Sequence, residues 1–524
     1  MKKQAKKKNV LKLKKRVKCP SFRIEEITIS KLQEALDQRK ITSHEIVKMY
    51  IERIKKIDSS GPTLRSVIEL NPDALAIAYQ MDMERRKKGP RGPLHGIPVL
   101  LKDNIATKDK METTAGSLAL VGSRPKRDSF VASRLREAGA IILGKTNLSE
   151  WANFRSSYSS SGWSARGGQV RNPYVLDRTP CGSSSGSAVA VAANLASVSV
   201  GTETDGSILC PSSSNCVVGI KPTLGLVSRS GVVPIAHSQD TVGPIARSVS
   251  DAAILLGALV GVDSEDQDTM QSEGKYYKDY TEFLDPNGLR GARIGVAREI
   301  YFGYSSKSDA IAETAINKMK ELGAVIIDPA NIPSAKQMRE SELELTVLLY
   351  EFKDDLNKYL SDLEESRVRT LKDIIESNEK NKEKELKYFG QDLFLKAEAT
   401  TNLQDPKYLS ALEENRKLSR KEGIDAVFDQ HQLDALVMPT SSPPWRIDLV
   451  DGDHGLGGSS QPSALAGYPA ITVPAGQVFG LPVGITFVGR AFSEPLLIKL
   501  AYSFEQATRA RVAPKYIESI EEKL

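Results

Sequence analysis

The side chains of this 524-residue chain that could do chemistry together are a lysine and two groups of serines. Lys102 ends the apolar run VLLK, and the serines lie in PCGSSSGSA at 180–188 and in GTETDGSILCP at 201–211. A lysine in this position is either a surface residue, free or paired with Asp103, or a partly buried amine that loses its proton and acts as a base. Position alone leaves both interpretations open.

Both serine segments can present backbone N–H groups to a negative charge. The first runs directly into the helix-like AVAVAANLA, so its amides would lie at a helix N-terminus, although a flexible Gly/Ser loop is the alternative. The second follows the strand-like SVSVG and turns at Asp205 and Gly206 before Ser207. A serine in such a tight turn can act as a nucleophile while the amides of the turn hold an oxyanion.

Two short motifs match other kinds of site formally. GAIILGKT at 139–146 fits the phosphate-binding P-loop pattern, but its middle residues are apolar, and we interpret them as a buried strand. GSSSG at 182–186 fits the G-x-S-x-G elbow with Ser184 as nucleophile, which needs a preceding strand and a later Asp and His. VLDRTP is a poor strand, and nothing distinguishes His237, His431 or His454 as a partner. The elbow is therefore a minority interpretation.

The histidines and cysteines predict no metal or cofactor site. The five histidines form no H-E-x-x-H motif, and no G-x-G-x-x-G occurs. The four cysteines have no C-x-x-C spacing, which favours reduced thiols in a cytosolic protein. These residues are Cys19, Cys181, Cys210 and Cys216.

The elements that must position the lysine and serines alternate between helix and strand. Capping-box spacing at Ser30 with Gln33 and at Thr42 with Glu45 predicts two early helices. Further along, residues 97–101 are predicted to form a strand, 130–138 a helix and 140–144 a second strand. This alternation indicates an α/β protein with helices packed on a sheet. The charged region 334–425 is predicted to be a helical layer with a solvated outer face.

The charge of the chain is concentrated at one end. Residues 1–18 hold ten of the 72 Lys and Arg and no acidic residue, which leaves 62 bases against 66 acidic residues elsewhere. We therefore expect a disordered basic arm at 1–20, a domain at 21–524, and no nucleic-acid partner. No run approaches ~18 apolar residues, and no apolar core of a signal peptide follows the arm. We expect a cytoplasmic protein without stable membrane insertion.

Taken in order, the segments GIPVLLKDN, PCGSSSGSA, GTETDGSI, GIKPTLGLVS and SQDTVGPIARSV resemble the amidase signature family. The resemblance continues through LDALVMPT, LAGYPAITVPAG and GLPVGITFVGR, and it covers roughly residues 25–510. It implies a single α/β domain with a large, twisted, mixed β-sheet and helices on both faces. It also displaces the elbow interpretation of GSSSG.

The same resemblance assigns roles to individual residues. It implies a catalytic lysine at Lys102, a bridging serine preceded by a cis peptide bond at Ser183, and an acyl-forming nucleophile at Ser207. The implied oxyanion hole is formed by the backbone amides of Thr204, Asp205, Gly206 and Ser207. Such a set would hydrolyse an amide through an acyl-enzyme without a metal.

Departures from the commonest family pattern indicate a branch. The usual T-G-G-S is replaced by T-D-G-S, the usual arginine two positions after the nucleophile is Leu209, and a usual glycine is Ser185. These changes resemble bacterial peptide amidases, which remove the C-terminal amide of a peptide and release ammonia. Other carboxamides are alternative substrates, and an amidotransferase subunit is a third possibility. Residues 151–172 are expected to line the substrate pocket. We expect the protein to be a monomer or a homodimer.

Overall fold

The computed structural model describes residues 22–520, so the expected basic arm at 1–20 lies outside the described residues. Their centre is an 11-stranded mixed sheet, which confirms the predicted α/β class. In sheet order the strands are β1 (Val67–Leu70), β3 (Ile141–Thr146), β2 (Pro98–Lys102), β6 (Val198–Glu203), β8 (Thr241–Ala246), β7 (Val218–Lys221), β12 (Ala470–Val478), β13 (Leu481–Val488), β11 (Ala435–Pro439), β9 (Arg293–Val296) and β10 (Val325–Ile327). A separate hairpin joins β4 (Trp163–Ser164) to β5 (Gly168–Gln169).

The directions of the strands divide the sheet into regions. The neighbours β3, β2 and β6 run parallel, as do β11, β9 and β10 at the other end. Between these groups, β8, β7, β12 and β13 pair antiparallel with their neighbours. The parallel strands β2 and β6 therefore end at the same edge of the sheet, and this brings Lys102 beside the segment that follows Glu203.

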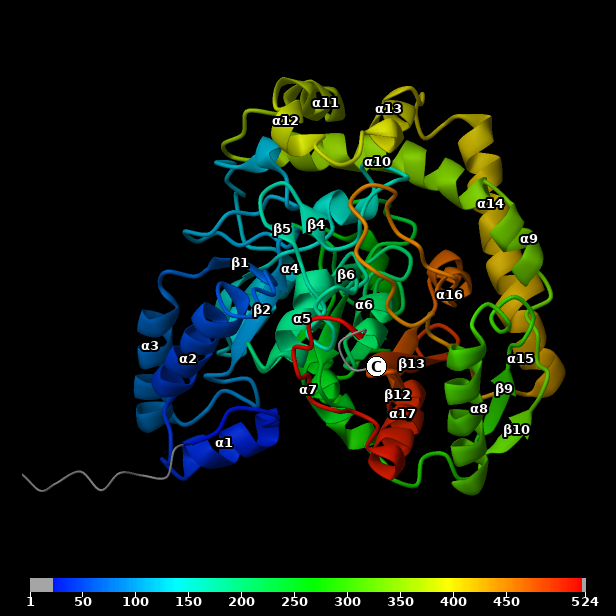
Figure 1. Ribbon diagram of the computed structural model, residues 1–524, viewed down its shortest axis with the longest axis horizontal. Helices are drawn as coiled ribbons and strands as arrows, with labels where there is room; N and C mark the ends of the chain where they lie inside the picture. Colours follow the sequence, from blue (N-terminus) through cyan, green and yellow to red (C-terminus); the bar gives the residue numbers. More distant parts are fainter. Residues whose placement is uncertain (1–21, 521–524) are drawn as a thin grey trace, which may run out of the picture.

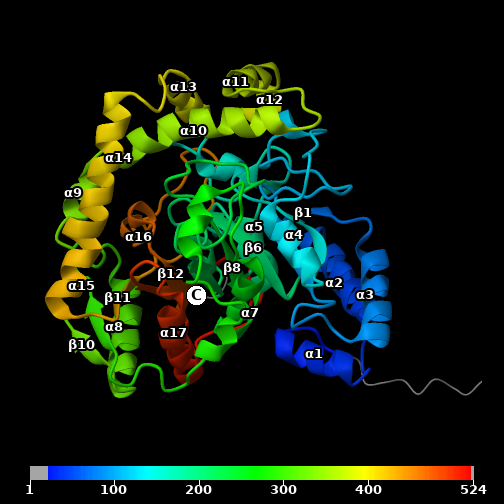
Figure 2. The same cartoon turned by 180° about the vertical axis from the view of Figure 1, so that it is seen from behind.

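Helices pack on both faces of this sheet (Figures 1 and 2), with α5 beside α6 and α4 beside α7. The α-helices are α1 (Ile29–Asp37), α2 (Ser43–Arg53), α3 (Ala74–Lys88), α4 (Phe130–Glu137), α5 (Ser185–Ala192), α6 (Leu209–Ser214), α7 (Val249–Leu259), α8 (Ser306–Glu321), α9 (Ala335–Glu340), α10 (Leu343–Asp362), α11 (Leu371–Lys380), α12 (Lys382–Glu385), α13 (Asp392–Glu398), α14 (Pro406–Ser419), α15 (Asp425–His431), α16 (Gln461–Ala466) and α17 (Glu494–Thr508). Figure 1 places α2 and α3 on one flank of the molecule and α9, α14 and α15 on the opposite flank.

Local sequence rules account for several of these boundaries. Thr42 and Glu45 form the predicted capping box at the start of α2. The prediction for α1 is wrong in its cap, because Thr28 rather than Ser30 accepts the hydrogen bond, from the amide of Lys31. The P-loop-like segment is the buried strand β3, as its apolar residues predict.

Helices α10 to α14 arch across one end of the molecule (Figure 1). The stripe Phe352, Leu356 and Leu360 on α10 is fully buried and packs with Trp151 and Phe154 in one apolar cluster. The helical layer is therefore joined by its core to the loop that follows β3.

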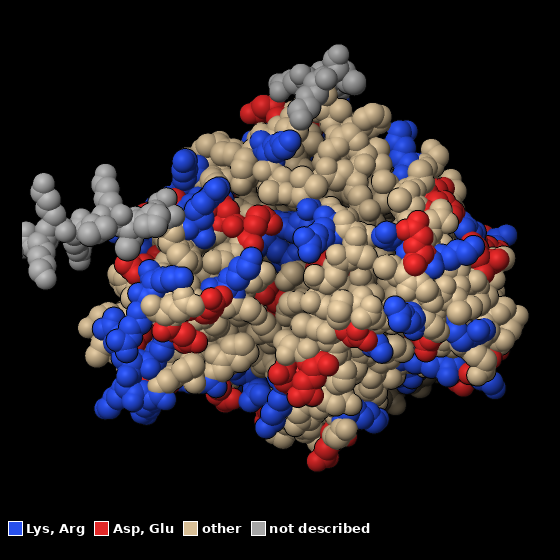
Figure 3. Space-filling view, turned by 90° about the horizontal axis from the view of Figure 1, so that it is seen from below, with Lys and Arg blue, Asp and Glu red and all other residues tan. Residues whose placement is uncertain are grey.

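The outer surface carries charges of both signs. Figure 3 shows Lys and Arg side chains interspersed with Asp and Glu over the face seen from below. Within residues 22–520, no helix combines the length and the apolar character that crossing a membrane requires.

Candidate active site

Lys102 is the last residue of β2 and is completely buried, which excludes the surface interpretation. Its Nζ donates hydrogen bonds to Ser183 Oγ at 2.7 Å, to Thr202 Oγ1 at 2.8 Å and to the Thr202 carbonyl at 3.2 Å. All three acceptors are neutral, so no carboxylate neutralises the amine by direct contact.

This environment changes the proton affinity of the amine. Burial lowers the pKa of Lys102 from 10.5 to about 7, although the charges of Asp240 and Glu203 act in the opposite direction. A neutral amine is therefore well populated near neutral pH, and it can accept a proton from the hydroxyl it contacts.

The first serine segment begins α5 and is fixed by backbone contacts. The peptide bond between Gly182 and Ser183 is cis, as the family resemblance implies. Ser184 Oγ donates to the Thr202 carbonyl at 3.0 Å and accepts from the Thr202 amide at 3.2 Å. Ser184 therefore binds the neighbouring strand β6. Within residues 22–520, Ser184 Oγ has no hydrogen bond to a histidine, so the minority elbow interpretation lacks its base.

The second serine segment turns sharply at the end of β6. One carboxylate oxygen of Glu203 accepts hydrogen bonds from the amides of Ile208 and Leu209, at 2.7 and 2.9 Å. Gly206 has a φ of +78°, a conformation that suits glycine. The Ser184 amide donates to the Ser207 carbonyl at 3.1 Å, so the two serine segments are in direct contact.

The amides expected to form the oxyanion hole are available. In the part of the chain that the structure describes, no acceptor takes the amide hydrogens of Asp205, Gly206 or Ser207. The side chain of Thr204 is fixed by a hydrogen bond, because its hydroxyl donates to Asp240 at 2.5 Å. The turn therefore offers several N–H donors from one short loop.

The expectation of reduced cysteines is wrong for two of them. Cys181 and Cys210 form a disulfide, while Cys216 is free and buried, and Cys19 lies outside the described residues. The two bonded cysteines are 29 residues apart in sequence, but they flank Ser183 and Ser207. The convergence of the two serine segments brings them together, and their sequence spacing could not indicate it.

A cavity of about 300 Å³ adjoins the serine segments. Its lining includes Gly182, Gly206, the disulfide, Trp445 and Asp453. The predicted pocket loop 151–172 contributes Asn153 and Ser161. The aromatic residues of this loop do not line the cavity. Trp151, Phe154 and Trp163 are buried elsewhere, and Tyr158 is exposed.

Sequence reasoning missed several residues of this site. Trp445 and Asp453 lie more than 200 positions after the serines, and no local pattern marks them. Asp240 stands in SQDTVG, a segment that the family resemblance included without giving its carboxylate a role. It accepts from Thr204 and from the amides of Ile235 and Ala236.

One cluster within residues 22–520 has ligand atoms grouped closely enough for a metal ion. His237, Glu351 and Asp355 each offer an atom, and these atoms lie within 4.8 Å of one another. None of the three lines the cavity beside the serines.

Known proteins share this architecture over nearly the whole chain. The amidase family model matches residues 45–498. A probable amidase of Arabidopsis thaliana is 47% identical over 505 residues, which cover 95% of this chain and 93% of that protein. The native peptide amidase of Stenotrophomonas maltophilia has a TM-score of 0.90 and 51% identity, covering 94% of this chain and 99% of that one.

A more distant relative belongs to an amidotransferase. This protein, one of the subunits of the glutamyl-tRNA(Gln) amidotransferase of Moorella thermoacetica, is 36% identical over 494 residues, or 92% of this chain and 96% of the relative. The family match, the extent of the relatives and the shared fold lead to one conclusion. This chain belongs to the amidase family and is an amide-hydrolysing enzyme.

Proposed function

We propose that the enzyme removes the C-terminal amide group of peptides and releases ammonia through an acyl-enzyme on Ser207. The observation that carries this proposal is the 2.7 Å hydrogen bond between Lys102 Nζ and Ser183 Oγ in a fully buried, carboxylate-free contact. The similarity to the peptide amidase of Stenotrophomonas maltophilia supports the choice of substrate.

Acylation needs one proton relay and one new bond. Neutral Lys102 accepts the proton of Ser183 Oγ, while Ser183 accepts the proton of Ser207 Oγ. Ser207 Oγ then attacks the amide carbonyl carbon, and the carbonyl oxygen takes up the electron pair of the C=O bond. The amides of the turn from Thr204 to Ser207 hold this oxyanion, each donor contributing about 3 kcal/mol.

Breakdown of the tetrahedral intermediate returns the protons. Ser183 protonates the departing nitrogen and recovers a proton from Lys102, and the C–N bond breaks to release ammonia. Water then attacks the ester carbonyl, with Ser183 and Lys102 accepting its proton. The ester bond breaks, Ser207 Oγ regains a proton, and the carboxylic acid leaves.

The charge of the cavity supports an amidated terminus over a free acid. Among the described residues, its lining holds Asp205 and Asp453 and no Lys, Arg or His. One oxygen of Asp205 is buried without a hydrogen-bond partner. Because no basic side chain of the described lining would bind a carboxylate, a neutral carboxamide enters such a cavity more readily than a free acid.

Mass spectrometry tests the proposal directly. Purified enzyme is incubated with an amidated peptide and with the same peptide as free acid, and ammonia is measured in parallel. We expect conversion of amide to acid in the first sample and no change in the second. Ser207→Ala provides the control for a contaminating hydrolase. An unchanged amidated peptide, with turnover of a simple aryl or aliphatic amide, would contradict the substrate assignment.

The alternative functions can be distinguished by the substrates that are hydrolysed and by whether activity needs a second chain. Aryl, indole-acetamide and fatty-acid amides belong in the same panel, because only the cavity walls would differ. A transferase role, suggested by the amidotransferase relative, requires activity that depends on an equimolar second chain. We propose a monomer or homodimer, which light scattering tests. The cytoplasmic location stays a prediction, and the disulfide removes one argument for it.

A further inference from the structure

Three consecutive residues before β8 contact three carboxylates on one face of α10. The amide of His237 donates to Asp355 at 3.0 Å, and the amide of Ser238 donates to Glu351 at 2.9 Å. The side chain of Gln239 donates to Glu344 at 3.0 Å. Positions 344, 351 and 355 share a helical face, so α10 presents one acidic stripe to this short segment.

The same segment supports the turn expected to form the oxyanion hole. Asp240 accepts from the amides of Ile235 and Ala236 through one oxygen and from the Thr204 hydroxyl through the other. Gln239 also donates to the Thr204 carbonyl at 3.4 Å. A displacement of residues 237–240 would therefore move Thr204, which begins the turn.

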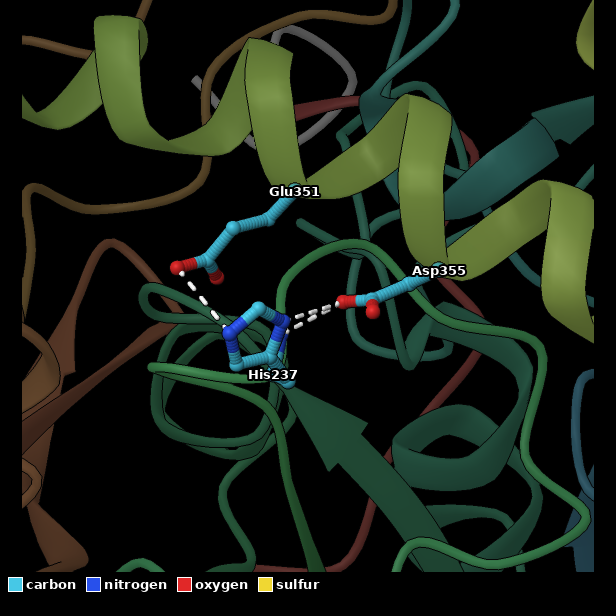
Figure 4. Close-up of side chains that lie close together, drawn as sticks. All are labelled: His237, Glu351 and Asp355. Atoms are coloured by element: carbon cyan, nitrogen blue, oxygen red, sulfur yellow. Dashed lines mark hydrogen bonds and ion pairs between the residues drawn. The ribbon is translucent and has the colours of Figure 1, made fainter. Parts of the chain in front are cut away.

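The imidazole of His237 lies between two carboxylates of the stripe (Figure 4). Its Nδ1 is 2.8 Å from Asp355 Oδ2, and its Nε2 is 3.5 Å from Glu351 Oε1. The carboxylates face different ring nitrogens, and the Asp355 oxygen also accepts the His237 amide. A metal ion shared by these side chains would bind one ring nitrogen, and both carboxylates would be directed toward that same nitrogen. The observed arrangement instead fits an imidazolium that is paired at both ring nitrogens.

We propose that His237 is a positioning residue: its imidazolium joins the acidic face of α10 to residues 237–240, and this joint holds Thr204 and the oxyanion turn in place. The inference rests on the proposed catalytic use of that turn. The helical layer that arches over the sheet then serves catalysis through one histidine, without touching substrate.

The charges around His237 set the direction of the pH dependence. Burial lowers the pKa of His237, but its hydrogen bond to Asp355 and the charge of Glu351 outweigh burial, so the net shift is upward. Arg229 opposes this rise. A group with a raised pKa keeps its contribution at low pH and loses it as pH rises through that pKa. The joint is therefore strongest below the pKa of His237, at pH values where Asp355 and Glu351 are still ionised, and it weakens as pH rises through that pKa. Burial raises the pKa of Glu351, so its pair with His237 is also lost in acid. Other charged or titratable groups that face this site from neighbouring elements are Asp268, Lys358, Tyr408, Arg416 and Arg420.

Kinetics over a range of pH separate positioning from mere stability. In His237→Gln we expect kcat to fall tenfold to a hundredfold, on the order expected for a displaced catalytic group, with KM nearly unchanged. The loss should shrink at alkaline pH, where the parent joint is also weakened. His237→Arg keeps a permanent charge and should restore kcat. His44→Gln on α2 is the matched control and should behave as the parent.

Hydrogen exchange followed by mass spectrometry gives a readout that needs no turnover. In a Ser207→Ala background, residues 233–240 should exchange faster in His237→Gln than in His44→Gln, after correction for intrinsic rates. Equal exchange in the two variants overturns the joint. Slowing of exchange by Zn²⁺, reversed by chelation, also overturns it in favour of a metal site. If exchange responds as expected while the parent enzyme, with Ser207 intact, hydrolyses no amide, the proposed function fails and the joint stands.

Discussion

Two buried lysines lie near the ends of adjacent parallel strands, on opposite faces of the sheet. Lys102 ends β2, and Lys145 lies opposite Leu101 on β3. Both are fully buried, and burial lowers the pKa to about 7 for Lys102 and to about 8 for Lys145. By burial and pKa alone, either could be taken for a general base.

Their contacts distinguish them. Lys145 Nζ donates to the Ile105 carbonyl at 2.7 Å and to Thr113 at 2.8 Å, and the charge of Asp103 raises its pKa. Lys102 Nζ contacts Ser183, whose segment adjoins the cavity. The comparison teaches that burial sets the proton affinity of an amine, while the neighbouring hydroxyl and its access to substrate decide whether that affinity is used.

Replacing each lysine by methionine should give the largest contrast. Lys102→Met removes the proposed base, and we expect kcat/KM to fall by at least ~10³-fold with folding retained. Lys145→Met leaves buried acceptors without a donor and should cost about 1–3 kcal/mol of unfolding free energy, with kcat of the folded protein close to the parent value. Kinetics and thermal melts of both variants measure this. Equal losses of kcat would break the distinction.

The pH profile sharpens the same comparison. Lys102 must be neutral to accept a proton, so acylation should slow about tenfold for each pH unit below its pKa of about 7 and level off above it. Lys145→Met should leave this acid limb in place. Pre-steady-state ammonia release between acid and neutral pH gives the profile. If the acid limb shifts in Lys145→Met, the limb does not belong to Lys102.

Removing the disulfide should weaken the region around Lys102 and leave the region around Lys145 unchanged. Cys181→Ser combined with Cys210→Ser releases both serine segments, and we expect a loss of about 3 kcal/mol of stability together with a lower kcat. Lys145→Met lies outside this link, so its destabilisation should add to that of the double serine variant. Denaturant titrations of four proteins, namely the parent, Lys145→Met, the double serine variant and the combination of all three substitutions, measure the sum. Strong non-additivity would mean that the two regions are coupled.

Deleting residues 1–18 should have the smallest effect. The arm carries ten Lys and Arg, and the candidate catalytic residues lie far from it in sequence. We expect unchanged kcat/KM and an unchanged acid limb. A drop in either value would show that the arm contacts the catalytic body.

Features that lie within a continuous stretch of sequence could be predicted, whereas contacts between segments far apart in sequence could not. Lys102, Ser183 and Ser207 stand in continuous motifs, so the resemblance could propose them, and the strands β2 and β6 next to them have local apolar patterns. The Cys181–Cys210 bond and the contacts of α10 join segments that only the folded sheet brings together. Apolar patterns alone do not distinguish Lys102 at the end of β2 from Lys145 near the end of β3, because the two lysines differ in their folded neighbours. Only the family resemblance pointed to Lys102.

The cavity has a consequence for engineering. Its floor comes from the two serine segments, while Trp445 and Asp453 belong to the connection between β11 and α16. That connection contributes none of the contacts of Lys102 Nζ. Residues 445–453 of this connection can therefore be varied as a cassette, with substrate preference as the selected trait, whereas Ser460 should be kept because its side chain hydrogen-bonds Asp205 of the serine turn.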